Sequence, residues 1–443
     1  MTARPARRRP LPTCPLCHSS TDTISAAEAS WLPPAVVERL EAEHTAWHRE
    51  DGACAACLQR ALLGVLFEHG NGAHPTVQSV WPIDARAAFG VLPTPLRLNA
   101  DHTVTGRGAT LALVDAGFYP HSDLVAGRNR IRAWLDASKE PVLGLRFEPD
   151  ERPQWPGWDK ARPAQWHGLM TSAVAAGDGA LSHGLYRGLA SEADVVLVQV
   201  RDGRGRITNA SIARALRWLA EFGPGLGVRV VNLSVGGDPV QRLAGNPVDE
   251  AVADLVDLGI VVVAAAGNDG RRRLVPPATA PAALTIGGLD DHNNFDPEQL
   301  ALWHSNYGRA VDGARKPELV APSMWVVAPV LPGTRVAREA TALFARRARG
   351  DNTAESRIAE HKLVTPYYQH VEGTSFAAPV VASIVACMLE ADRSLTPARI
   401  REILLAAAQP VPGARAERQG AGAIDAGRAV ALVKAQVAEP RRG

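Results

Sequence analysis

The 443-residue chain has few cysteines, almost no net charge and no long hydrophobic run. Its longest apolar runs, residues 259–267 and 377–389, are too short to cross a hydrocarbon layer about 30 Å thick, so we expect no membrane contact. Arginines at residues 7–9 lead straight into prolines instead of an apolar segment, which argues against a secretory leader and favours a cytoplasmic protein. A formal net charge of +2 gives no global reason to expect nucleic acid as a partner.

Beyond residue 98, strand-length apolar runs alternate with helical segments. Strands are expected at residues 109–114, 194–200, 228–233 and 260–266, and helices at residues 212–222 and 248–258. This rhythm predicts an α/β domain with a doubly wound, mostly parallel sheet and helices on both faces. We place this domain at residues 99–436, after a linker or lead-in at residues 71–98 and before a tail at residues 437–443.

Four of the five cysteines form two C-x-x-C pairs near the N-terminus. The paired residues are Cys14, Cys17, Cys54 and Cys57. Two thiolate pairs on tight turns can close a tetrahedral site around Zn²⁺ and thereby stabilise a segment that is too small to fold alone. We therefore predict a small zinc-binding module over residues 1–70, with a structural zinc ion held by these four thiolates.

Other interpretations of the module stay open. A histidine could replace one cysteine as a ligand, and the candidates are His18, His44 and His48. The thiols could also be reduced and free of metal, whereas a redox pair is disfavoured because neither motif follows a strand of a βαβ unit. A nucleic-acid reader is disfavoured as well, since the module lacks a dense Lys/Arg face with interleaved aromatics. We expect it instead to dock on the α/β domain or to recruit a regulatory protein partner.

Three polar residues lie where elements of the α/β domain begin or end. Asp115 follows a predicted buried strand, and His167 begins a helix of small residues. Ser375 follows a Gly-Thr turn at the start of an apolar helix, where unpaired backbone N–H groups and the positive end of the helix dipole favour a developing oxyanion. Pro379 is expected in the opening turn, where its missing N–H costs little. Taken singly, Asp115 could cap the next segment and Ser375 could belong to a core helix.

The motifs around these residues resemble those of subtilisin-like serine peptidases, and the resemblance covers residues from about 99 to about 433. Four motifs occur in the family's order: Asp-x-Gly at 115–117, His-Gly at 167–168, Ala-Ala-Gly-Asn at 265–268 and Gly-Thr-Ser-x-Ala-Ala-Pro at 373–379. Ala116 is a departure, because relatives usually carry serine or threonine between the aspartate and the glycine. The order and number of the motifs make the resemblance specific.

The resemblance implies a serine endopeptidase that acts on protein or peptide substrates and needs no cofactor for catalysis. His167 would accept the proton of Ser375, and Asp115 would hold the imidazole. Asn268 would donate to the oxyanion together with the Ser375 N–H. The backbone expected to bind substrate lies at Ser234, Val235, Gly236, Ala266 and Gly267. The alternative function is a catalytically idle fold of the same family that binds peptides or serves as a scaffold.

Three further segments stand apart from the family pattern. The segment at residues 332–370 is long and contains a basic helical piece, which fits an autoprocessing loop, a partner surface or a solvated insertion. Residues 91–95 are proline-rich, and we hypothesise that they lie across the substrate cleft as a brake. A loop rich in tryptophan either lines a binding surface or is anchored by its rings, and its residues are Trp134, Trp155, Trp158 and Trp166.

Overall fold

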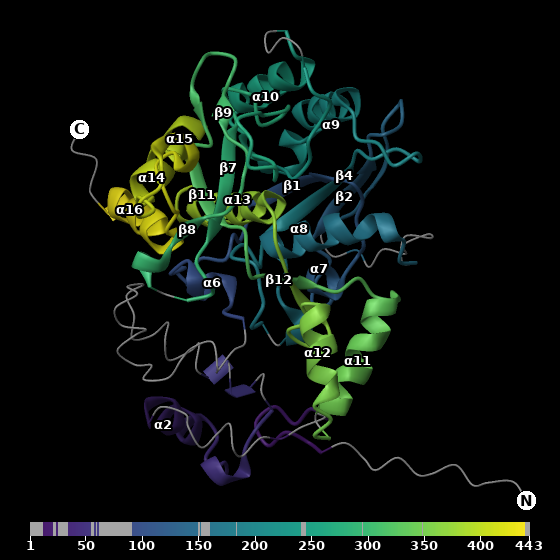
Figure 1. Ribbon diagram of the computed structural model, residues 1–443, viewed down its shortest axis with the longest axis vertical. Helices are drawn as coiled ribbons and strands as arrows, with labels where there is room; N and C mark the ends of the chain where they lie inside the picture. Colours follow the sequence, from purple (N-terminus) through teal and green to yellow (C-terminus); the bar gives the residue numbers. More distant parts are fainter. Residues whose placement is uncertain are drawn as a thin grey trace, which may run out of the picture.

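The computed structural model describes most of the chain (Figure 1). The described residues are 12–20, 24, 34–54, 57–58, 60–61, 91–148, 151, 160–182, 184–240, 245–294, 296–347 and 349–438. Most of the predicted lead-in, the two central loop tryptophans and the end of the predicted tail lie outside these residues.

A nine-stranded sheet forms the centre of the described α/β domain, in the order β11-β7-β6-β5-β1-β4-β2-β3 with β8 beside β7. The strands are β1 (Thr110–Asp115), β2 (Ile131–Asp136), β3 (Leu143–Arg146), β4 (Asp194–Gln199), β5 (Val228–Leu233), β6 (Val261–Ala265), β7 (Leu284–Asp290), β8 (Ala301–Leu302) and β11 (Leu319–Pro322). All neighbours pair in parallel except β3 on β2 and β8 on β7. The prediction of a mostly parallel sheet is confirmed.

Helices cover both faces of this sheet, as predicted (Figure 1). One face packs against α8 (Trp166–Ala176), α13 (Thr374–Ala391), α14 (Pro397–Ala407) and α16 (Ala426–Ala438). The other packs against α9 (Asn209–Phe222) and α10 (Pro247–Asp257). Burial on both faces explains why the inner strands are near-continuous runs of Val, Leu and Ala. Because β1 pairs with both β4 and β5, the ends of these three strands meet at the point where the chain crosses to the other half of the sheet.

The longest apolar helix, α13, runs through the centre of the domain (Figure 1). It spans 18 residues, five more than the apolar run at residues 377–389, because three residues precede that run and two follow it. Among the described residues it alone is long and apolar enough to cross a membrane by length and composition, and 83% of it is buried inside the protein. Its hydrophobicity is therefore that of a core helix.

Residues 91–98 are built into the α/β domain. The N–H of Leu92 donates to Asn293 Oδ1 at 2.8 Å. The guanidinium of Arg97 binds both carboxylate oxygens of Asp291 at 2.7 and 2.8 Å, and both side chains are buried. These contacts fix the segment inside the fold and away from the predicted cleft residues, so the hypothesis that it lies across the cleft as a brake is wrong. The segment contains the short helix α6 (Thr94–Arg97).

The long segment between β12 (Val326–Pro329) and β13 (Tyr368–Val371) forms a helical hairpin. Its helices, α11 (Arg335–Arg347) and α12 (Thr353–Glu360), pack on each other through a small apolar cluster of their own. The predicted basic helix is thus present as α11, and a second helix accompanies it. In Figure 1 the hairpin projects from the body at the end where the N-terminal residues lie.

The described part of the N-terminal module contains α2 (Pro34–Glu43) and a short 3₁₀ turn (Arg49–Asp51). Its cysteines and the buried Trp47 share one hydrophobic cluster with Tyr186, Val327 and Tyr368 of the α/β domain. The module therefore packs on that domain, and it does so beside the β12–β13 pair. The remaining short helices of the described residues are α7 (Ser122–Val125) and α15 (Ala416–Gln419), and the remaining strands are β9 (Gly308–Arg309) and β10 (Arg315–Lys316).

Candidate active site

The structure brings Asp115 and His167 into contact. Asp115 is the last residue of β1, and His167 is the second residue of α8. The Nδ1 of His167 lies 2.6 Å from Asp115 Oδ1, while the carboxylate is only 1% exposed. Because a carboxylate accepts, Nδ1 carries the proton, and Nε2 is left as the basic nitrogen of the imidazole.

A glycine at the start of α8, Gly168, makes this contact possible. A Cβ added at Gly168 would lie 2.1 Å from the carbonyl oxygen of Gly117, closer than any real Cβ contact. The start of α8 therefore rests directly on the backbone that follows β1. Because Gly168 has no Cβ, the helix can approach the carbonyl of Gly117 this closely, and the aspartate and the histidine can meet.

Thr171 is a site residue that the sequence reading missed. It lies one helical turn after His167, on the same face of α8, and its Oγ1 donates to Asp115 Oδ2 at 2.8 Å. The other oxygen, Oδ1, accepts from the N–H of Ala116 as well as from His167. The buried carboxylate is thus fully hydrogen-bonded in one orientation. The i, i+4 spacing from His167 was the available signal.

Burial and the neighbouring Asp115 set the pKa of His167. Burial lowers the pKa of His167, but the charge of Asp115 and its hydrogen bond raise it more, and the net pKa lies above the ordinary 6.5. Exposure of the imidazole side chain is 21%, so the ring remains accessible from the cleft. A histidine held in this way can accept a proton near neutral pH.

Ser375 lies in the first turn of α13, and Phe376, the residue after it, packs against the imidazole of His167 with ring centroids 5.8 Å apart. The turn before it depends on Gly373, whose φ of +132° is unfavourable for other residues. A Cβ at Gly373 would also crowd the Nδ2 of Asn268, at 3.3 Å. Ser375 is partly exposed and lies between two paired N–H groups: that of Thr374 donates to Asn268 Oδ1, and that of Phe376 donates to the carbonyl of Gly373.

Pro379 has a different role from the one predicted. Since α13 begins at Thr374, the proline lies inside the helix, beyond its first turn. Its missing N–H leaves the carbonyl of Ser375 without its helical donor. Ser234 Oγ donates to that carbonyl instead, at 2.8 Å, and Asn232 Nδ2 donates to Ser234 at 2.9 Å. Because Pro379 leaves the Ser375 carbonyl free, the hydroxyl of Ser234, which follows β5, can hold the serine turn in place.

Asn268 is oriented by its neighbour in α13. Its Oδ1 accepts from the backbone N–H of Thr374 at 3.1 Å and from the hydroxyl of Thr374 at 2.7 Å. Since both donors face the amide oxygen, the Nδ2 group points the other way, and the residue is exposed. An amide donor is thereby presented beside the N-terminus of α13, where an oxyanion would form.

A cleft of about 500 Å³ lies along these residues. It is lined by Asp115 and His167 together with Ser234, Val235 and Gly236. After β5, the N–H of Gly237 donates to Pro276, and within the described residues no backbone bond pairs Val235 or Gly236. This leaves an extended edge at which a peptide can add as a strand. Ala266 and Gly267, the other predicted substrate-binding residues, precede Asn268 directly, and neither lines this cleft.

The tryptophans near the site divide between the two predicted roles. Trp134 is buried on β2, with 4% exposure, and anchors the structure. Trp166 is 47% exposed, lines the cleft and packs edge-on against His167 with ring centroids 5.2 Å apart.

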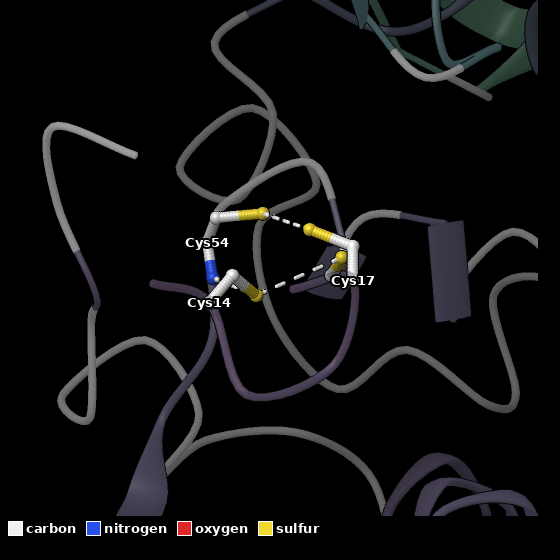
Figure 2. Close-up of side chains that lie close together, drawn as sticks. Cys14, Cys17 and Cys54 are labelled. Carbon is white, nitrogen blue, oxygen red and sulfur yellow. Dashed lines mark hydrogen bonds between the residues drawn. The ribbon is translucent and has the colours of Figure 1, made fainter. Parts of the chain in front are cut away.

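The four predicted zinc ligands also converge (Figure 2). Their sulfur atoms all lie within 4.8 Å of one another, and two of the pairs, Cys14 with Cys57 and Cys17 with Cys54, are 4.0 Å apart. A tetrahedral ion bonded to sulfur at about 2.3 Å needs sulfurs about 3.8 Å apart, so the cluster fits Zn²⁺. Among the described residues this group contains cysteines alone, and none of the three candidate histidines belongs to it.

The low pKa of one of the four cysteines supports the fit of the cluster to Zn²⁺. The Sγ of Cys14 accepts a backbone hydrogen bond from Cys54 at 3.4 Å. The side-chain hydrogen bond with Cys57 lowers the pKa of Cys54 to about 5 against the effect of burial. The hydrogen bond with Cys54, together with burial, raises the pKa of Cys57, so Cys54 is the thiolate of this pair and Cys57 would release its proton when a metal binds.

Comparison with known proteins agrees with this geometry. The chain is 29% identical over 333 residues to serine protease AprX of Bacillus subtilis (73% of this chain, 66% of that protein), and 27% identical over 349 residues to halolysin of Haloferax mediterranei (77% and 53%). It spans about half to two thirds of the length of these relatives.

Solved structures with the same fold include a protease from Pseudoalteromonas arctica PAMC 21717 (TM-score 0.53, 23% identity, 77% of this chain and 94% of that chain) and the protease domain of PatA (TM-score 0.51, 22%, 75% and 98%). The model of the Subtilase family matches residues 106–422, which is most of the chain and contains all four motifs. The chain therefore belongs to the subtilase family.

Proposed function

We propose that the protein is a serine endopeptidase that uses Ser375, His167 and Asp115 as its catalytic triad. The observation that carries the proposal is the buried contact between Asp115 and His167 beside the start of α13, where the serine lies. The accessible imidazole and the open edge at Val235 and Gly236 support it, because a peptide bound there would lie along the same cleft.

In the proposed reaction, Ser375 Oγ attacks the carbonyl carbon of the peptide bond and its proton moves to His167 Nε2. The negative charge that forms on the carbonyl oxygen is stabilised by Asn268 Nδ2 and the N–H of Ser375. His167 then gives the proton to the leaving amine, which breaks the C–N bond and leaves an acyl ester on the serine. Water repeats the sequence on the ester and releases the acid. Asp115 keeps the imidazole oriented and stabilises its positive form.

The test of this function is labelling with a fluorophosphonate, a small reagent that reacts with activated serines. The intact protein should be labelled at Ser375, and the Ser375→Ala variant should not be labelled. If the folded parent protein resists labelling, the chain is an idle member of the family that binds peptides without cleaving them.

The acidic limb of the pH–rate profile should lie above pH 6.5. The sign follows from the role of His167, which must be neutral to accept a proton: the rate falls as the pH drops through its pKa, and the net effect of Asp115 raises that pKa. kcat/KM for a peptide substrate should be measured from pH 5 to pH 9. A midpoint below 6.5 on a substrate limited by chemistry would contradict the assignment.

We also propose that the four cysteines hold one structural zinc ion. When bound, the metal cross-links the module and leaves no open position for water, so it takes no part in peptide hydrolysis. Free thiols are typical of a reducing compartment, which supports an intracellular location. The module contacts Tyr368 of β13, five residues before Gly373, and this contact supports a regulatory role through a protein partner.

Replacing Cys54 and Cys57 by serine should remove the zinc, from about one ion per chain to none by elemental analysis. Hydrogen exchange in residues 34–54 should become faster, because the hydrophobic cluster around the cysteines loses its cross-link. The Cys387→Ala variant is the matched control, since this thiol is buried in α13 and should leave the zinc content unchanged. Fluorophosphonate labelling should persist in both variants. Absence of metal from protein purified under reducing conditions would contradict the zinc proposal.

A further inference from the structure

The border of the cleft is strongly cationic on the loop that follows β4. Arg201 and Gly205 line the cleft together with Asp115 and His167. The loop reads Arg-Asp-Gly-Arg-Gly-Arg over residues 201–206. Its one carboxylate, Asp202, is paired with Arg206 at 3.2 Å, so Arg201 and Arg204 keep positive charges without an ion-pair partner among the described residues.

A second cationic loop follows the proposed oxyanion donor. Three arginines in a row, Arg271, Arg272 and Arg273, come directly after Asn268-Asp-Gly, and all three are exposed. The loop is held in place by Asn306, whose Oδ1 accepts from the N–H groups of Asp269 and Arg271 at 2.9 and 3.1 Å. Among the described residues, none of these three arginines forms an ion pair. The backbone of this loop is therefore held in place, and its three exposed arginines follow Asn268 by three to five residues.

A recess of about 360 Å³ adjoins the cleft on the side of β2 and β4. It shares Ala116, Ala164 and Arg201 with the cleft, and it adds Lys139 and Arg162. Both added cations are exposed, and within the described part of the chain neither is paired with a carboxylate. The carboxylates of the recess, Asp136 and Asp202, are engaged by Ser138 and by Arg206.

We infer that the cleft selects polypeptide substrates with aspartate or glutamate close to the scissile bond. Cations outnumber carboxylates along both loops and in the recess, although the net charge of the whole chain is only +2. Such an uneven distribution attracts acidic segments and repels basic ones. The inference rests on the proposed function and adds the class of substrate to it.

The expected size of the preference for acidic substrates follows from the exposure of the arginine side chains. Exposed ion pairs are weak, so each arginine contact should raise kcat/KM for an acidic substrate by about two- to fivefold. Several such contacts together should give at least a tenfold preference at low salt. Because charges in water are screened over about 8 Å at physiological ionic strength, the preference should shrink as salt is added.

The experiment uses the full-length protein and two fluorogenic peptides that are identical except for glutamate or glutamine at the positions flanking the cleaved bond. The ratio of kcat/KM for the two peptides should exceed about ten at low ionic strength and fall at 0.5 M NaCl, roughly toward one. A ratio near one at low salt, or a preference for a lysine-flanked peptide, would overturn the inference.

Arginine-to-glutamine variants test whether the two loops cause the preference for the glutamate peptide. The ratio should fall about two- to fivefold in Arg201→Gln and further in the triple variant with glutamine at residues 271–273. Arg415→Gln is the control, because this exposed arginine lies before α15, on the C-terminal helices. A ratio that all variants leave unchanged would overturn the assignment. If the labelled, active enzyme cleaves both peptides equally, only the inference fails, whereas absence of both labelling and cleavage removes the proposed function as well.

Discussion

Replacing Ser375 by alanine should lower kcat for a peptide substrate by about 10⁵- to 10⁶-fold. The variant loses the atom that attacks the carbonyl carbon, and the general base then has no alcohol to activate. Residual hydrolysis of about 10³- to 10⁴-fold over the uncatalysed reaction should remain, because Asn268 and the cleft still bind the substrate and stabilise charge. Single-turnover kinetics with excess enzyme measures both quantities.

Ser383→Ala is the matched control for this variant. Ser383 lies in the same helix, two turns after Ser375, and is fully buried with its hydroxyl donating to Val380 within the helix. Its removal should leave kcat within about threefold of the parent, because the residue touches no part of the cleft. Equal losses in the two variants would mean that α13 is merely destabilised, and retention of activity by Ser375→Ala would assign the nucleophile elsewhere.

Local patterns predicted four of the nine strands of the central sheet, β1, β4, β5 and β6, and the errors at the ends of predicted elements have local causes. The strand expected at residues 228–233 is β5 itself, because its apolar run begins after a glycine and ends at Ser234. The helix expected from residue 212 begins at Asn209, since Thr208 caps it by accepting from the N–H of Ser211. A polar first turn of this kind cannot be predicted from the spacing of apolar residues.

Contacts between segments that are far apart in the chain could not be predicted from the sequence. Motif order placed Asp115 near His167, but nothing in it indicated that Ser234 would hold the carbonyl that Pro379 leaves free. Likewise, the lead-in before residue 99 reads as an extended proline-rich stretch, and its burial depends on a carboxylate 194 residues away that pairs with Arg97. Such pairings are set by the tertiary fold, and a single sequence carries no period or spacing that reveals them.

Replacing Asp115 by asparagine should lower kcat by about 10⁴-fold while leaving the fold intact. The substitution keeps the shape of a side chain that is buried between His167, Ala116 and Thr171, but it puts an amide NH₂ group, which donates, in place of one accepting carboxylate oxygen. It removes the negative charge that stabilises the imidazolium formed during attack. Thr171→Val is the comparison, because it deletes one hydrogen bond to the carboxylate and keeps the charge, and it should cost only about tenfold.

The pH profile separates this electrostatic role from a structural one. In the parent, the charge of Asp115 raises the pKa of His167 against the lowering effect of burial. Without that charge, burial alone acts, so the pKa of His167 falls and the neutral form persists to lower pH. The acidic limb of the Asp115→Asn profile should therefore shift to lower pH, whereas that of Thr171→Val should stay near the parent position. A loss of kcat with an unmoved acidic limb would mean that Asp115 only positions the helix, and that His167 owes its basicity to other groups.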